Sequence, residues 1–192
     1  MCFNNSIFSQ KIELGVKIGP SSASQYVQSI KNIESITGYH FGFFTSIKLP
    51  FNFTIQPEIQ YSRQGAKFSF NQVTAVANLD YINIPILLGK DFNFINFHIG
   101  TQFGFLSDVN LSINQIPFNI KENILKSDYS FVSGIKVKLF KGFSISFRYV
   151  KGLKNIVNPD LINSILPVDA KKIKNILFQL SINYSIVHKI KN

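Results

Sequence analysis

The sequence predicts an all-β protein, an eight-stranded antiparallel up-and-down transmembrane β-barrel. Eight segments alternate apolar and polar residues, which is the period of a strand with only one apolar face. The links between these segments alternate long and short along the chain. A barrel that runs up and down through an outer membrane has this arrangement, with short turns on one side and long loops on the other.

The predicted strands differ little in composition. Their apolar faces are rich in Ile, Phe and Leu, whereas their other faces are rich in Gly, Ser and Gln. The segment 79–90 is the exception, because it is apolar on both faces for most of its length. Two prolines, Pro57 and Pro85, lie inside predicted strands and are expected to mark bulges or bends. The eight predicted strands are residues 12–19, 39–48, 53–62, 79–90, 95–105, 131–139, 143–149 and 178–186.

The links between the predicted strands alternate between short and long. Short links at 49–52, 91–94 and 140–142 are predicted as tight turns. Long links are predicted at 20–37, 69–78, 108–126 and 154–172. An even strand number places both termini on the side of the short turns, which is expected to be the periplasm.

Composition narrows the class of protein. No run of about 18 apolar residues occurs, which excludes a conventional transmembrane helix. Charged residues make up 16% of the chain, below the roughly 25% of soluble domains. The net charge of +10 is spread along the sequence, so no nucleic-acid partner is expected. Two interpretations of this charge remain open: a basic loop region that faces anionic lipopolysaccharide, or the Lys-rich coding of an AT-rich genome.

The two ends of the chain are expected to lie outside the barrel. Residues 1–10 are interpreted as a signal-peptide remnant or a disordered N-terminus, residues 11–188 as the outer-membrane β-barrel domain, and residues 189–192 as a basic C-terminal tail. The single cysteine, Cys2, excludes an internal disulfide and leaves no metal-binding spacing with three scattered histidines. A lipid anchor on Cys2 is a lesser alternative.

The polar faces carry charges of both signs, which could pair inside the barrel. We expect at least one acid and one base to pair across strands, because an unpaired buried charge is costly. Alternation alone does not say which face is outward, and a soluble lipocalin-like barrel would place the apolar face inward. The residues expected to point into the lumen are Glu13, Lys17, Lys48, Glu58, His98, Lys136 and Arg148.

No catalytic or cofactor motif was found in the sequence. It has no Gly-rich phosphate loop, HExxH, CxxC or GxSxG, so neither an enzyme nor a cofactor is expected. His98 could be a proton-handling group, but a lumen hydrogen-bonding residue is the simpler interpretation. His40 is expected near a membrane interface, and Asp80 at a strand edge or turn. Possible lipopolysaccharide contacts are Lys171, Lys172 and Lys174, which otherwise form a solvated loop edge.

Two segments carry a resemblance to a known family. Residues 55–62 (IQPEIQYS) followed by Gly65-Ala66-Lys67, and residues 79–88 (LDYINIPILL), resemble segments of the PorT-like outer-membrane β-barrel proteins of Bacteroidetes. The spans 15–19 and 100–106 are similar in character, so the resemblance extends from Ile12 to Ile186. Asn83 departs from it, because that family often has Glu there. The resemblance implies an eight-stranded outer-membrane barrel and a possible association with type IX secretion, but little about activity.

The functional hypothesis is therefore a non-enzymatic protein in the outer membrane of a Gram-negative bacterium. It would have a structural or interaction role in the cell envelope, with a link to protein secretion as its finer form. Expected partners are outer-membrane lipid, lipopolysaccharide and envelope or secretion-system proteins. The alternatives are a soluble lipocalin-like barrel that binds a small hydrophobic ligand, and an outer-membrane enzyme with loop-borne residues. The sequence makes no prediction of oligomeric state.

Overall fold

The computed structural model describes residues 12–27, 33–70, 73–114, 116–118, 125–155 and 173–188. Eight long strands form the wall of the molecule, and two short strands and one 3-10 helix, η1 (Pro50–Asn52), accompany them. The long strands are β1 (Ile12–Val27), β3 (Ile36–Lys48), β4 (Phe53–Phe70), β5 (Val73–Phe92), β6 (Ile95–Ile113), β8 (Ser127–Lys138), β9 (Phe143–Gly152) and β10 (Ile173–His188). The short strands are β2 (Ile33–Glu34) and β7 (Ile116–Phe118). In the described part of the chain, no helix is long and apolar enough to cross a membrane.

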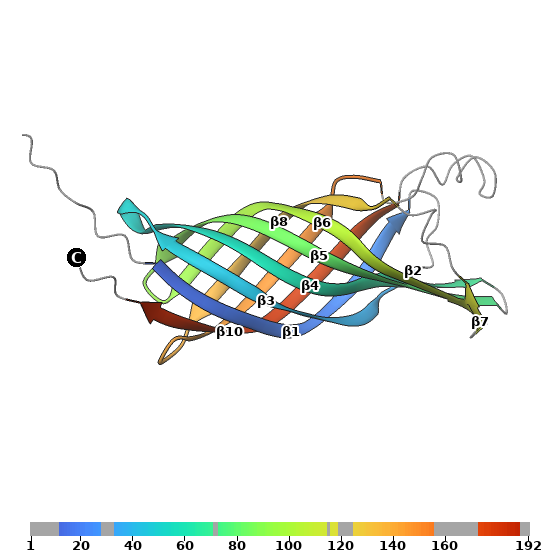
Figure 1. The fold of residues 1–192 in the computed structure, drawn as a ribbon, viewed down its shortest axis with the longest axis horizontal. Coiled ribbons are helices and arrows are strands. Elements are labelled where there is room, and N and C mark those ends of the chain that lie inside the picture. Colours follow the sequence, from blue (N-terminus) through green and yellow to red (C-terminus); the bar gives the residue numbers. More distant parts are fainter. Residues whose placement is uncertain are drawn as a thin grey trace, which may run out of the picture.

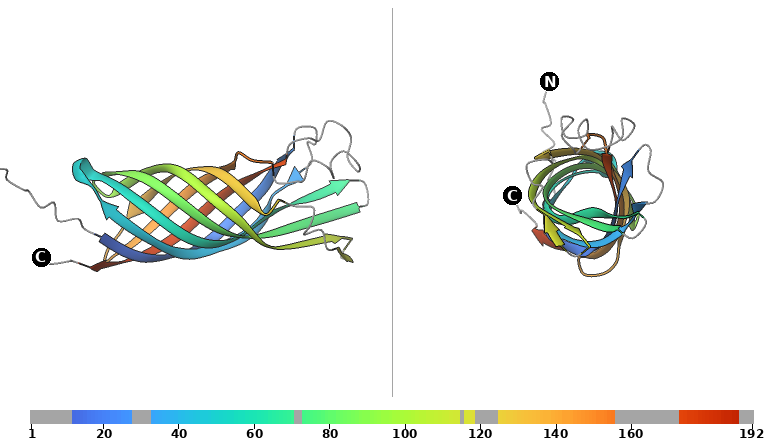
Figure 2. Two further views of the ribbon diagram at one scale, coloured as in Figure 1. Left: turned by 45° about the horizontal axis from the view of Figure 1, so that its top comes forward. Right: turned by 90° about the vertical axis from the view of Figure 1, so that its right-hand side faces the viewer.

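The eight long strands close into a barrel. Each pairs antiparallel with the next long strand along the chain, and β1 pairs with β10, from Ile12 opposite His188 to Val27 opposite Ile173. Figure 1 shows the tilted strands from the side, and the end-on view in Figure 2 shows the closed ring. The predicted eight-stranded antiparallel barrel is therefore confirmed.

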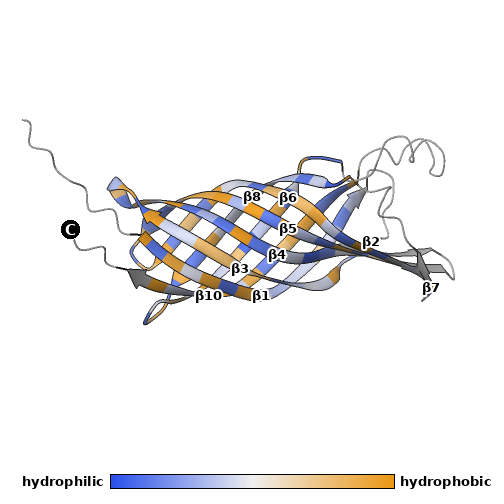
Figure 3. Cartoon of the chain, viewed as in Figure 1, coloured by the Kyte–Doolittle hydropathy of each residue, from blue (hydrophilic) through white to orange (hydrophobic). Residues whose placement is uncertain are grey.

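The alternation of residues sorts them onto the two sides of the wall. Large apolar side chains such as Phe43, Ile99 and Leu180 are about half exposed or more on the outside. Side chains that are polar or small, such as Gln60, Ser146 and Asn183, are buried inside. Figure 3 shows this alternation of hydropathy along the strands. An outer surface of this kind suits lipid rather than water, because a soluble barrel would bury its apolar face inward.

The short turns gather at one end of the barrel, here named the short-turn end. Helix η1 joins β3 to β4, a turn at Asn93 and Phe94 joins β5 to β6, and residues 139–142 join β8 to β9. Gly142 has a φ of 84°, a conformation that glycine adopts without steric cost. The start of β1 and the end of β10 also lie at this end (Figure 1), since Ile12 is opposite both Ile47 and His188.

At the opposite, long-connection end, the strands are longer than the sequence predicted. The predicted link 69–78 is mostly paired strand, since β4 and β5 remain in register to Phe70 and Val73. Strand β6 continues to Ile113 and β7 folds back onto it, while β1 extends to Val27. Backbone pairing continues past the apolar band of the wall. There the outer face no longer contacts lipid, so the residues do not need to alternate between apolar and polar. Residues 156–172 and the predicted end segments 1–10 and 189–192 lie outside the described residues.

The in-strand prolines do not mark the bulge. The register of β5 against β6 is continuous from Tyr81 to Phe92, including Pro85 opposite Gln102. The register of β4 against β5 is the same on both sides of Pro57. The irregularity lies instead between Asp80 and Tyr81, so the prediction that the prolines mark bulges was wrong. The paired residues of β4 and β5 are nevertheless interrupted between Pro57 and Gln60.

Candidate functional site: the charged interior of the barrel

The centre of the lumen is organised around Glu58, which points inward from β4. Arg148 of β9 donates two hydrogen bonds to its carboxylate, from Nη1 to Oε2 over 2.7 Å and from Nη2 to Oε1 over 2.6 Å. Lys17 of β1 donates from Nζ to Oε2 over 3.3 Å. The Lys17 and Glu58 side chains have no exposed surface and that of Arg148 has 1%. Glu58 thus joins β4 to β1 and β9 across the lumen, and none of these three strands pairs with another.

A second group of side chains surrounds this centre. Arg148 Nε donates to His98 Nε2 over 3.1 Å, and His98 Nδ1 lies 3.3 Å from Asn96 Oδ1. Lys136 Nζ donates to Gln56 Oε1 over 2.5 Å and lies 5.1 Å from the centroid of the Phe44 ring. Gln56 Nε2 in turn donates to Glu58 Oε1. We name this connected set the charged layer: Lys17, Phe44, Gln56, Glu58, His98, Lys136 and Arg148.

Two glycines make room for the charged layer. A Cβ at Gly15 would overlap the Phe44 ring. A Cβ at Gly134 would lie 2.8 Å from His98 Nε2 and 2.9 Å from Arg148 Cγ. The inward positions of the wall are therefore small where the interior side chains are large.

The charged layer is unbalanced in charge. It holds three cations, Lys17, Lys136 and Arg148, against one carboxylate, Glu58. Charges in a poorly hydrated interior interact much more strongly than in water. Glu58 is therefore the residue on which the electrostatics of the charged layer depends.

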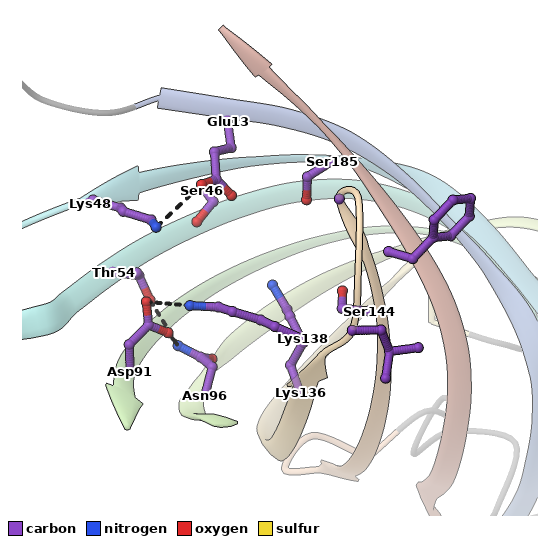
Figure 4. A pocket seen from close by; sticks show the side chains of 13 residues that line it. Glu13, Ser46, Lys48, Thr54, Asp91, Asn96, Lys136, Lys138, Ser144 and Ser185 are labelled. Atoms are coloured by element: carbon purple, nitrogen blue, oxygen red, sulfur yellow. Dashed lines mark hydrogen bonds and ion pairs between the residues drawn. The ribbon is translucent and has the colours of Figure 1, made fainter. Parts of the chain in front are cut away.

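A polar pocket of about 240 Å³ lies between the charged layer and the short-turn end. Figure 4 shows Lys48 beside Glu13, and Lys138 beside Asp91 and Asn96. The Nζ–carboxylate distances are 3.3 Å for Lys48 and 2.7 Å for Lys138. Lys136 also lines this pocket, so the charged layer forms one of its boundaries.

All seven lumen candidates named from the sequence line the interior or its short-turn mouth. Five of them, Lys17, Glu58, His98, Lys136 and Arg148, meet in the charged layer, whereas Glu13 and Lys48 pair separately at the mouth.

Sequence reasoning missed His40, which had been expected at an interface. It is fully buried in the lumen, with Nε2 2.7 Å from Ser181 Oγ. His40 has the same parity as the inward residues Gly42 and Phe44, so the period-two pattern would have placed it correctly.

Asp80, expected at a strand edge or turn, lies inside β5 in an ion pair with Arg63, whose Nε donates over 2.8 Å and whose Nη2 donates over 2.9 Å. Lys174 is the second residue of β10 and lies on the outward face, beyond Ile176 and Phe178, while Lys171 and Lys172 lie outside the described residues.

The family of the chain follows from its sequence. Residues 8–158 match the family model described as outer membrane protein beta-barrel domain, which covers well over half of the chain. The protein belongs to this family of outer-membrane β-barrels. As a member of the family it is an outer-membrane protein, and the soluble lipocalin-like alternative is not favoured. No curated protein matches the chain.

Solved structures show the same fold in other members of the outer-membrane barrel class. Neisserial surface protein A is 9% identical, with a TM-score of 0.59 over 90% of this chain and 97% of that one. Ail, the attachment invasion locus protein of Yersinia pestis, is 12% identical, with a TM-score of 0.51 over 91% of this chain and 98% of that one. At these identities the similarity concerns the fold alone.

Proposed function

We propose that the protein is a non-catalytic and non-conducting outer-membrane barrel that acts by presenting its long-connection end to a partner in the cell envelope. The observation that carries this proposal is the charged layer. An eight-stranded barrel has an interior only wide enough for side chains. Here side chains from β1, β3, β4, β6, β8 and β9 fill its centre and bind one another.

Catalysis has no support in the described residues. They contain no cluster of three or more His, Cys, Asp or Glu residues that could hold a metal ion. His98 is buried and is engaged by Arg148 and Asn96, which suits a structural hydrogen-bonding role better than proton transfer to a substrate.

The long-connection end is better suited to an interaction. Strands β4, β5 and β6 extend there as a projecting sheet, with β2 and β7 added at its sides (Figures 1 and 2). Rigid scaffolds commonly carry binding surfaces on their connecting segments. The resemblance to PorT-like proteins supports an envelope or secretion-system protein as the partner.

The proposed orientation places the long-connection end outside the cell and both termini in the periplasm. The start of β1 and the end of β10 share the short-turn end, and barrels of bacterial outer membranes have short periplasmic turns and longer external loops. An epitope inserted between residues 71 and 72 should be accessible on intact cells. The same epitope inserted after Lys141 should become accessible only after the outer membrane is permeabilised.

Conductance in planar bilayers tests the plugged interior. The parent should show no stable channels, whereas the double variant Lys17→Ala, Arg148→Ala should show small ones if it folds. Stable, large conductance in the parent would contradict the proposal.

Shortening the β4–β5 hairpin tests the interaction surface. Replacing residues 67–76 with Asn-Gly would join Ala66 to Ala77, which are opposite one another, through a two-residue turn. The barrel should still fold and the envelope phenotype of a gene deletion should not be rescued. Full rescue by this variant, and by equivalent shortening of β6–β7, would refute the proposed surface.

A further inference from the structure

Two lysines end the apolar face of neighbouring strands at the long-connection end. Outward residues along β9 run Ile145, Phe147, Tyr149 and then Lys151. Outward residues along β10 run Ile182, Leu180, Phe178, Ile176 and then Lys174. Both strands thus change from apolar to cationic at the same end of the barrel.

The strand register places these two lysines together. Lys151 is opposite Ile176, and Lys174 lies two residues further along the same face of β10. Diagonal neighbours of this kind are about 7–8 Å apart, within reach of long side chains. Tyr26, which is 55% exposed, is opposite Lys174 on the other side, and Tyr149 packs on Phe178 with ring centroids 5.2 Å apart. Tyrosines at such positions are typical of a membrane–water boundary.

Two other outward cations at this end are paired with carboxylates. Arg63 pairs with Asp80, and Lys67 Nζ lies 2.9 Å from Glu34 Oε2. Within the described part of the chain, no carboxylate pairs with Lys151 or Lys174. This pair of lysines therefore offers unneutralised positive charge at the edge of the lipid-facing wall.

We propose that Lys151 and Lys174 bind phosphate groups of lipopolysaccharide, whose acyl chains lie against the wall formed by Phe147, Phe178 and Leu180. The proposal rests on the proposed orientation, because lipopolysaccharide occupies the external leaflet. Charge complementarity selects the ligand: two ammonium groups just beyond an apolar wall match an anionic headgroup above hydrocarbon chains. The site consists of Lys174, which was named from the sequence as a lipopolysaccharide contact, and Lys151, which was not.

Binding of purified full-length protein in detergent tests this site. The probes are lipopolysaccharide and the same lipopolysaccharide stripped of its phosphates. The parent should bind the phosphorylated form at least about tenfold more tightly, because charge-assisted hydrogen bonds are lost with the phosphates. The double variant Lys151→Gln, Lys174→Gln should lose that preference while still folding, as judged by its gel shift on heating.

A matched variant controls for net charge. Lys90→Gln with Lys141→Gln removes two positive charges near the short-turn end and should retain the preference for phosphate. An equal loss in both double variants, or equal binding of both probes by the parent, would overturn the site. Equally strong competition by phosphatidylglycerol would overturn lipopolysaccharide as its ligand. A detergent micelle does not separate an external from a periplasmic compartment, so these results do not depend on the orientation that the epitope insertions test.

Discussion

Two glutamate–cation pairs in this protein have similar geometry but different surroundings. Glu58 contacts Arg148 at 2.6 Å in the lumen, where both side chains are almost completely buried. Glu34 contacts Lys67 at 2.9 Å on the projecting sheet, where the two side chains are 56% and 39% exposed. The comparison teaches that a short distance does not by itself make a strong interaction. Burial decides what is lost when one partner is removed.

Removing each glutamate tests this contrast most strongly. Glu58→Gln would leave Lys17 and Arg148 without their shared carboxylate, and breaking a buried pair costs about 3–5 kcal/mol. Glu34→Gln should cost roughly 0–1 kcal/mol, as exposed pairs do. Urea titration of the folded barrel in lipid vesicles, followed by gel shift, measures both free energies of unfolding. Equal losses in the two variants would contradict the special role of the charged layer.

Charge placed on the outer wall should distinguish the apolar band from the projecting end. Ile99→Arg would place a cation on the middle of the lipid-facing surface and should cost roughly 2–4 kcal/mol if it lies at the bilayer midplane. Thr37→Arg, also on the outer face but at the long-connection end, should cost about 0–1 kcal/mol. Folding yield into vesicles gives the comparison. If Ile99→Arg folds as well as the parent, the assignment of the outer face to lipid is wrong.

Glycine substitutions extend the comparison within the lumen. Gly134→Ala would place a Cβ 2.5 Å from the Phe147 backbone oxygen and within 3 Å of His98 and Arg148, so backbone and side chains would have to move, and overpacking of this kind typically costs about 1–3 kcal/mol. Gly104→Ala meets mainly the Asn83 side-chain oxygen at 2.8 Å, and the Asn83 amide nitrogen has no hydrogen-bond partner, so we expect a loss below about 1 kcal/mol. Thermal unfolding in detergent would rank the two. The reverse order would mean that the charged layer adapts more easily than its neighbours.

The sequence predicted the fold well for a simple physical reason. Lipid outside and a crowded polar interior impose the period of two on every strand that crosses the membrane. Beyond the apolar band this requirement ends, so the extensions of β4, β5 and β6 looked like loops. Strand boundaries and the facing of side chains are therefore harder to predict at the ends of the strands than at their centres.

The interior partners could be predicted only in part. Parity points Glu58, Lys17 and Arg148 inward, but it does not say which of them meet. Glu58 and Arg148 are 90 residues apart in sequence and lie on strands that do not pair with each other. Their contact depends on the curvature and register of the closed barrel, which residue types alone do not encode.

The seam between β1 and β10 has a consequence for the order of assembly. Every other pairing of long strands joins segments that are consecutive along the chain, so those hairpins can form from nearby residues. The seam joins Ile12 to His188, and contacts between such distant residues are the slowest to form. Until β10 arrives, both open edges would expose unpaired backbone groups to hydrocarbon, which lipid does not tolerate. Insertion should therefore be completed only after the last strand has been synthesised, and a chain that ends before residue 173 should remain outside the bilayer.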